Sequence, residues 1–217
     1  MLTLPNAKQR IALLGSTGSG KTLGGLWHLS NANFDTMPWT IIDFKRDEHI
    51  EAIERAQHVS SNDTPKHPGI YVLQPEPEED ISGYLTRVWR KGSHGVFVDE
   101  GFVMSEIAAN EQRFKTLLTQ GRSLRIPMII CSQRPAWITR FVFSEADYVQ
   151  MWRLNDLRDQ KTVESFLPRG AYKRMPDYHS LYYNVSKNKL VYLKPVPDEA
   201  TTLQKIEDRL RPVRKVV

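Results

Sequence analysis

The sequence of 217 residues predicts an α/β protein with a mostly parallel central sheet and helices on both faces of that sheet. Short apolar segments alternate along the chain with longer segments of helical periodicity, which is the pattern of parallel strands joined by crossover helices. Hydrophobic residues make up 40% and charged residues 25% of the chain, as in an ordinary globular protein. The longest apolar run, at 126–131, contains Pro127, so the sequence predicts no membrane-spanning helix, which needs about 20 apolar residues.

The predicted strands are short apolar runs bounded by glycine, proline or charged residues. They lie at residues 11–14, 39–43, 69–73, 95–100, 126–131 and 147–154. A terminal hairpin is predicted at 180–185 and 189–193, because two runs of strand-forming residues flank the polar segment 186–188.

The predicted helices carry apolar residues at helical spacing and end near glycine, proline or polar clusters. The first begins at Lys21 and carries Leu23, Leu26 and Trp27, and another contains Tyr84, Leu85 and Trp89. The others lie at residues 45–57, 111–118, 156–167 and 198–210. Residues 60–69 contain two prolines and are predicted to form a loop.

Length and cysteine content bound the domain organisation and the cellular compartment. At roughly 150 residues per domain, we expect a single domain over residues 1–217, with a helix, hairpin and helix in 156–217. Cys131 is the single cysteine, which excludes a disulfide framework and favours a reducing compartment. The first ten residues lack the apolar stretch of a secretory signal. The net charge of +5 is compatible with a polyanionic partner.

A glycine-rich loop follows the first predicted strand and fits the P-loop (Walker A) pattern G-x4-G-K-[ST]. Its glycines let backbone N–H groups surround phosphate oxygens, and the helix that follows adds the positive end of its dipole. Lys21 can reach the β- and γ-phosphates, and the Thr22 hydroxyl can bind Mg²⁺. We therefore expect nucleotide binding at Gly15, Ser16, Thr17, Gly18, Ser19, Gly20, Lys21 and Thr22.

Two acidic residues end the predicted strand at 95–100. An acid at the carboxyl end of a buried parallel strand lies beside the phosphate loop in this class of sheet. We expect Asp99 to hold the Mg²⁺ shell and Glu100 to orient and activate a water molecule. Gln133 follows the predicted strand 126–131, and its amide can donate to the γ-phosphate and accept from the attacking water.

Two reaction types remain open at this point, namely hydrolysis and transfer to a substrate hydroxyl. An acid directly after the Mg²⁺ aspartate favours hydrolysis over transfer to a substrate hydroxyl. Some nucleoside kinases also carry Asp-Glu here, so a nucleoside or small-molecule kinase is the alternative. Such an enzyme would consume ATP only with its acceptor.

Three further segments carry a resemblance to a known family. Gln120-Gly-Arg122 precedes a predicted strand and Ser132-Gln-Arg-Pro135 follows it, while Thr40-Ile-Ile-Asp43-Phe-Lys45 ends another strand. Together with the P-loop, in this order, these motifs resemble the FtsK/HerA superfamily of DNA-translocating ATPases. The resemblance spans about residues 10–155, which would form the motor core. A bare motor of this size resembles the genome-packaging ATPases of tailless, membrane-containing viruses.

The resemblance implies a RecA-like P-loop fold and hydrolysis of Mg-ATP coupled to translocation of double-stranded DNA. It also implies self-assembly into a ring, expected to be a hexamer, docking on capsid vertex proteins, and action in the host cytoplasm and at the packaging vertex. Pilus, conjugation or filamentous-phage assembly motors are alternatives within the same superfamily.

The same resemblance assigns roles to individual residues. Lys21, Thr22, Asp99, Glu100 and Gln133 would hold the roles given above. Arg122 would reach the γ-phosphate bound by the neighbouring subunit. Arg122 directly follows Gly121, where the predicted helix should end, and Arg125 is its rival for this role.

Overall fold

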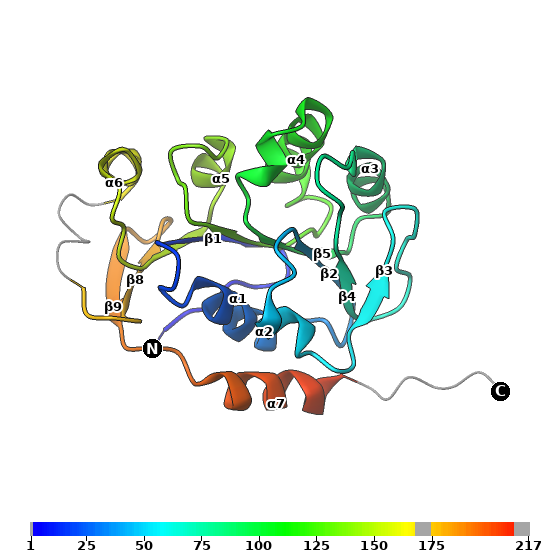
Figure 1. Cartoon of the computed structure of the whole chain (residues 1–217), viewed down its shortest axis with the longest axis horizontal. Coiled ribbons are helices and arrows are strands. Elements are labelled where there is room, and N and C mark those ends of the chain that lie inside the picture. The colour runs from blue at the N-terminus through cyan, green and yellow to red at the C-terminus, as the bar shows by residue number, and fades with distance from the viewer. Residues whose placement is uncertain (1, 168–174, 211–217) are drawn as a thin grey trace.

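The computed structural model describes residues 2–167 and 175–210, which form one central sheet with helices on both faces (Figure 1). The sheet of the described residues has nine strands in the order β3-β4-β2-β5-β6-β1-β7-β8-β9. The strands are β1 Arg10–Leu14, β2 Pro38–Asp43, β3 Gln57–Val59, β4 Gly69–Leu73, β5 Gly95–Asp99, β6 Met128–Ser132, β7 Tyr148–Met151, β8 Ser180–Asn184 and β9 Lys189–Leu193. The strands from β3 to β7 in this order pair in parallel, and β8 and β9 pair antiparallel. The predicted fold class and the terminal hairpin are confirmed.

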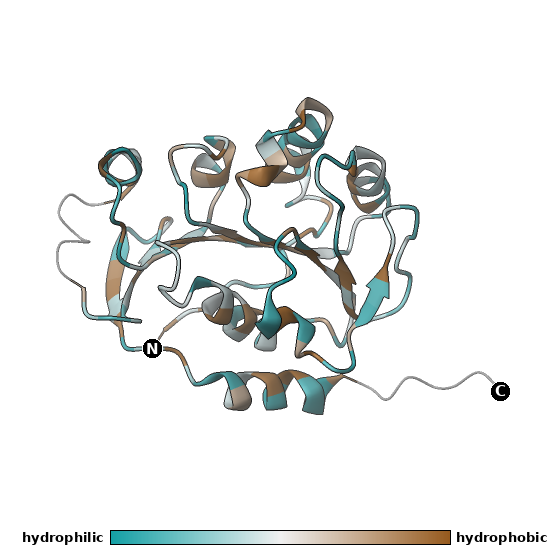
Figure 2. Cartoon of the chain, viewed as in Figure 1, coloured by the Kyte–Doolittle hydropathy of each residue, from teal (hydrophilic) through white to brown (hydrophobic). Residues whose placement is uncertain are grey.

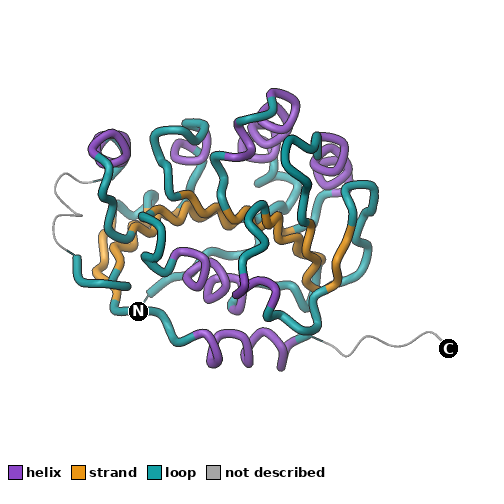
Figure 3. The backbone as a smooth tube through the Cα atoms, in the orientation of Figure 1, coloured by secondary structure: helices purple, strands orange, loops and turns teal. Residues whose placement is uncertain are grey.

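Helices cover the sheet in two layers. They are α1 Lys21–Ser30, α2 Glu48–Glu51, α3 Ser82–Lys91, the 3-10 helix η1 Val103–Ser105, α4 Ala108–Gln120, α5 Phe141–Ser144, α6 Leu157–Glu164 and α7 Glu199–Arg209. One layer contains α3, α4, α5 and α6, and the other contains α1, α2 and α7 (Figures 1 and 3). In the described part of the chain, no helix has the length and apolarity that crossing a membrane requires.

Each helix layer encloses its own apolar core against the sheet. One core includes Val98, Phe114 and Ile130 under α3 and α4, and the other includes Leu26 and Phe97 under α1. The strands are accordingly hydrophobic along their length, whereas the helices are hydrophilic on their outer faces (Figure 2). Burial on both faces explains why the strand sequences read as continuous apolar runs rather than as alternating ones.

The predicted helix at 45–57 is wrong in extent, because only Glu48–Glu51 is helical. The side chain of Asp43 accepts hydrogen bonds from the backbone N–H groups of Lys45 and Asp47, each at 3.2 Å. This turn at the end of β2 keeps the chain out of the helix until Asp47 caps it. The edge strand β3 begins at Gln57, the last residue of the predicted helix, and periodicity did not indicate this strand.

The parallel pairing brings three chain segments to the same edge of the sheet. In the register, Leu14 of β1 lies beside Ser132 of β6, and Asp99 of β5 lies beside Cys131 of β6. The loops that follow β1, β5 and β6 therefore meet at the carboxyl edge, where open α/β sheets bind their ligands.

Candidate nucleotide-binding site

The P-loop connects β1 to α1 at the centre of the carboxyl edge. Gly18 and Gly20 adopt left-handed backbone angles, with φ of 71° and 91°, which residues with a side chain seldom adopt. The N-terminal half of α1 approaches the sheet closely, since a Cβ on Gly25 would stand 2.4 Å from Cζ of Phe97. The loop N–H groups and the helix N-terminus thus surround the position where phosphates bind in this motif.

Polar groups inside the loop have few partners among the described residues. The Lys21 ammonium donates to the backbone carbonyl of Ser16 at 3.1 Å, and burial lowers the pKa of Lys21. The Ser19 hydroxyl is buried and has no hydrogen-bond partner within residues 2–167 and 175–210. The Lys21 ammonium and the Ser19 hydroxyl can therefore still donate hydrogen bonds, and a bound phosphate would accept them.

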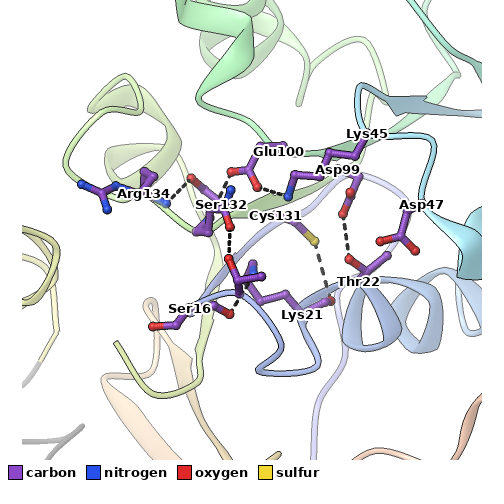
Figure 4. Close-up of polar contacts among 12 residues, drawn as sticks. Ser16, Lys21, Thr22, Lys45, Asp47, Asp99, Glu100, Cys131, Ser132 and Arg134 are labelled. Atoms are coloured by element: carbon purple, nitrogen blue, oxygen red, sulfur yellow. Dashed lines mark hydrogen bonds and ion pairs between the residues drawn. The ribbon is translucent and has the colours of Figure 1, made fainter. Parts of the chain in front are cut away.

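Thr22 and Asp99, which the sequence places 77 positions apart, are in direct contact (Figure 4). The Thr22 hydroxyl donates to Oδ1 of Asp99 at 3.1 Å, whereas Oδ2 of Asp99 is buried and has no partner in the described part of the chain. Burial, with neighbouring carboxylates adding to its effect, raises the pKa of Asp99 to about 6. Mg²⁺ in phosphate sites takes oxygen ligands, commonly one or two carboxylates together with substrate phosphates. The hydroxyl and the unpaired carboxylate oxygen fit such an ion, although the described residues hold no cluster of three or more acidic, histidine or cysteine side chains that could bind a metal.

Glu100 is buried and strained. Its φ of 100° lies in the left-handed region, where a non-glycine residue costs roughly 1–3 kcal/mol. One carboxylate oxygen is paired with the ammonium of Lys45, and the other accepts the backbone N–H of Gln133 at 3.0 Å. These contacts aim the carboxylate toward the space above the P-loop (Figure 4). Strain held by the surrounding structure in this way is typical of functional sites.

Gln133 connects β6 to the phosphate loop. Its side-chain oxygen accepts a hydrogen bond from the hydroxyl of Thr17 at the tip of the P-loop. Gln133 therefore lies between Glu100 and the phosphate loop. The sequence-predicted residues of the P-loop, Asp99, Glu100 and Gln133 are all brought together at one site.

Arg122 lies at the opposite edge of the sheet. Its guanidinium pairs with Asp147 at 2.6 Å, and Asp147 also accepts the backbone N–H of Arg10 at the start of β1. The five residues of β1, or roughly 15 Å, separate this ion pair from the P-loop. Arg122 does not contact the nucleotide site of its own chain, and its side chain is 56% exposed.

Lys45 is the site residue whose part sequence reasoning missed. It belongs to the motif Thr40-Ile-Ile-Asp43-Phe-Lys45, but no sequence pattern pairs it with Glu100, 55 positions away. Burial acts to lower the pKa of Lys45, but the hydrogen bond and charge of Glu100, together with the charge of Asp99, outweigh burial and raise this pKa. A buried acid ending a neighbouring strand was the available signal, because such a carboxylate requires a charge partner.

Comparisons with known proteins identify the family and support the fold. No protein-family model matches the chain. The chain is 41% identical over 219 aligned residues to the DNA packaging ATPase P9 of Enterobacteria phage PRD1, covering 95% of each protein.

Two solved structures share the fold. The genome packaging NTPase B204 from Sulfolobus turreted icosahedral virus 2 has a TM-score of 0.71 and 17% identity, covering 89% of this chain and 100% of that chain. The pCW3 conjugation coupling protein TcpA has a TM-score of 0.63 and 17% identity, covering 93% of this chain and 64% of that chain. These comparisons do not favour the kinase alternative. Identity over nearly the whole chain decides the assignment, and the protein belongs to the family of the DNA packaging ATPase P9 of phage PRD1.

Proposed function

We propose that this protein hydrolyses Mg-ATP to drive double-stranded DNA into a preformed viral capsid. The observation that carries the proposal is the hydrogen bond between Thr22 and Asp99 beside a P-loop that Glu100 faces. The relative that is 41% identical to this chain is named a DNA packaging ATPase. A P-loop alone would serve any nucleotide enzyme. A buried carboxylate facing the phosphate loop serves water activation in particular.

The site residues divide the reaction among them. Lys21 and the P-loop residues 15–20 bind the β- and γ-phosphates, and Thr22 and Asp99 hold Mg²⁺, which neutralises phosphate charge when bound. Glu100 accepts a proton from the attacking water, and Gln133 orients that water against the γ-phosphate. The protein thereby supplies positioning and charge stabilisation, which phosphoryl transfer chiefly requires.

Lys45 sets the resting state of this machinery. Its pairing with Glu100 occupies one carboxylate oxygen before nucleotide binds. The γ-phosphate carries negative charge that attracts the same ammonium, so phosphate binding competes for Lys45. We therefore assign Lys45 a positioning role, in which it holds the Glu100 carboxylate in place before nucleotide binds.

The assembly proposed for this motor is a ring of identical subunits, taken as a hexamer, around double-stranded DNA. Arg122 lies far from its own P-loop, so a phosphate contact by Arg122 requires a neighbouring subunit. Residues 1–217 act as one motor domain within each subunit. The ring works in the infected host cell and docks on proteins of the capsid vertex.

DNA-stimulated ATP hydrolysis tests the proposal. We expect long double-stranded DNA of any sequence to raise the turnover of the purified protein, and DNA binding to weaken steeply with salt because phosphate neutralisation dominates it. Glu100→Gln should still bind Mg-ATP but lose hydrolysis by roughly a hundredfold or more, because the amide cannot accept the proton. ATP consumption that requires a small-molecule acceptor, or a salt-independent preference for one short DNA site, would contradict the proposal.

A further inference from the structure

A second pocket adjoins the P-loop on the side away from Asp99 and Glu100. P-loop residues 16–19 line one wall, and Trp152, Arg153 and residues 176–179 line the other. The sequence motifs assign no function to the second wall. The two walls are joined by a hydrogen bond from the backbone N–H of Ser16 to the carbonyl of Arg153 at 2.9 Å.

The strand order fixes which end of a nucleotide faces this pocket. β1 carries the P-loop and lies between β6 on one side and β7 on the other. The groups proposed to act on the γ-phosphate, Asp99, Glu100 and Gln133, all follow β5 or β6. A triphosphate lying across the P-loop with its γ-phosphate over β6 extends its nucleoside toward β7 and β8.

The antiparallel direction of β8 delivers an aromatic residue to this place. Because β8 begins at the carboxyl edge, residues 176–179 arrive beside the P-loop just before it. The ring of Tyr178 lies against the loop, since a Cβ on Gly20 would stand 3.2 Å from its Cδ1. Tyr178 as a whole residue is 58% exposed, and it lines the pocket.

The neighbours of Tyr178 hold it in position. Its own φ of 61° is an outlier for a bulky side chain. His179 stacks on Tyr192 of β9 with ring centroids 5.4 Å apart, and Asp177 pairs with Arg153 at 3.2 Å. An ordered aromatic ring with an exposed face presents a stacking surface at small entropic cost.

We infer that Tyr178 is the platform on which the base of the bound nucleoside triphosphate stacks. This inference rests on the proposed use of ATP and names the base-binding part of the same site. Stacking uses the π-face that every base has, so Tyr178 contributes affinity without selecting one base by hydrogen bonds.

Nucleotide and tripolyphosphate titrations of Tyr178→Ala test the inference. We expect the Kd and KM for ATP to rise roughly tenfold, as the loss of one base–aromatic stack implies. The Kd for tripolyphosphate, which has no base, should stay unchanged, and so should kcat, because Tyr178 is remote from the γ-phosphate groups. Tyr178→Phe keeps the ring and should behave as wild type. The control is Tyr183→Ala, which removes an aromatic residue of the hairpin whose hydroxyl donates to Asn188.

A fluorescent nucleotide gives an independent readout. The triphosphate of 2-aminopurine riboside should be quenched on binding to wild-type protein and to Tyr178→Phe, and should stay bright when bound to Tyr178→Ala. Equal loss of ATP and tripolyphosphate affinity would show that Tyr178 only supports the P-loop, and no loss of ATP affinity would also overturn the inference. These measurements do not use DNA, so a failure of the base-stacking inference can be distinguished from a failure of the packaging proposal.

Discussion

A single ion pair controls the group proposed to activate water. Glu100 is 1% exposed and strained, and Lys45 supplies the one cation that its carboxylate contacts among the described residues. A charged hydrogen bond of this kind fixes the position of a carboxylate oxygen. The placement of the group proposed to activate water therefore depends on a residue outside both the P-loop and the Asp99-Glu100 pair.

Lys45→Met should lower kcat while leaving the Kd for Mg-ATP close to that of wild type. Without the ammonium, the Glu100 carboxylate loses the contact that holds one of its oxygens in place, so kcat should fall by roughly tenfold or more. Steady-state rates and nucleotide titrations measure the two quantities separately, and Lys45→Arg should restore kcat. Arg46→Met, which removes an exposed ion pair with Glu76, is the matched control. An unchanged kcat for Lys45→Met would exclude the positioning role.

At the scale of elements, buried polar contacts tie α1 to β7 and β8. His28 of α1 lies 2.6 Å from the side-chain oxygen of Gln150, whose amide donates to Ser180 at 2.8 Å. Burial lowers the pKa of His28 to about 4, against the opposing effect of its hydrogen bond to Gln150. The helix that begins the phosphate site is thus fixed to the sheet by a histidine that must stay neutral.

This histidine predicts acid sensitivity of the fold. The unfolded chain takes up the His28 proton near pH 6.5 and the folded chain only near pH 4, so stability is full above pH 6.5 and declines as pH falls toward 4. The expected loss from His28 is about 1.4 kcal/mol per pH unit in this window. Urea unfolding at pH 7 and pH 5 should show a smaller decline for His28→Gln than for wild type. His67→Gln, at an exposed position, should keep the wild-type decline.

At the scale of the whole molecule, the nucleotide site and Arg122 lie at opposite edges of the sheet. β1 links them directly, since Asp147 holds both the Arg122 guanidinium and the backbone of Arg10, and the P-loop begins after Leu14. In a closed ring, one edge of each subunit faces the opposite edge of the next when subunits join head to tail. In this arrangement, Arg122 can reach the γ-phosphate bound by the neighbouring subunit.

Mixing two inactive variants tests that arrangement. Lys21→Ala and Arg122→Ala should each be inactive alone, since a trans arginine is worth on the order of 10³ in rate. In mixed rings, some interfaces pair an intact P-loop with an intact Arg122, so ATPase activity should partly return. Arg125→Ala, three positions away, should remain active. No recovery in rings shown to be mixed, or full activity of Arg122→Ala, would reject the assignment.

Much of the candidate site follows from the sequence because its parts are local. The P-loop is one continuous segment, and Asp99, Glu100 and Gln133 each end a strand that is recognisable by its apolar run. Parallel pairing then forces these strand ends to one edge, so their proximity needed no knowledge of side-chain packing. The alternation of strands and helices likewise determined the fold class.

Only the tertiary structure decided contacts between segments with no local signal. The turn made by Asp43 replaced much of the helix that the polar pattern at 45–57 predicted, and so freed Lys45 to reach Glu100. The antiparallel entry of β8 brought Tyr178 to the P-loop from 158 positions along the chain, and the tertiary fold brought Asp147 to the Arg122 guanidinium, 25 positions away. Hydrophobic periodicity records which face of an element is buried, whereas strand order and direction decide which distant side chains meet.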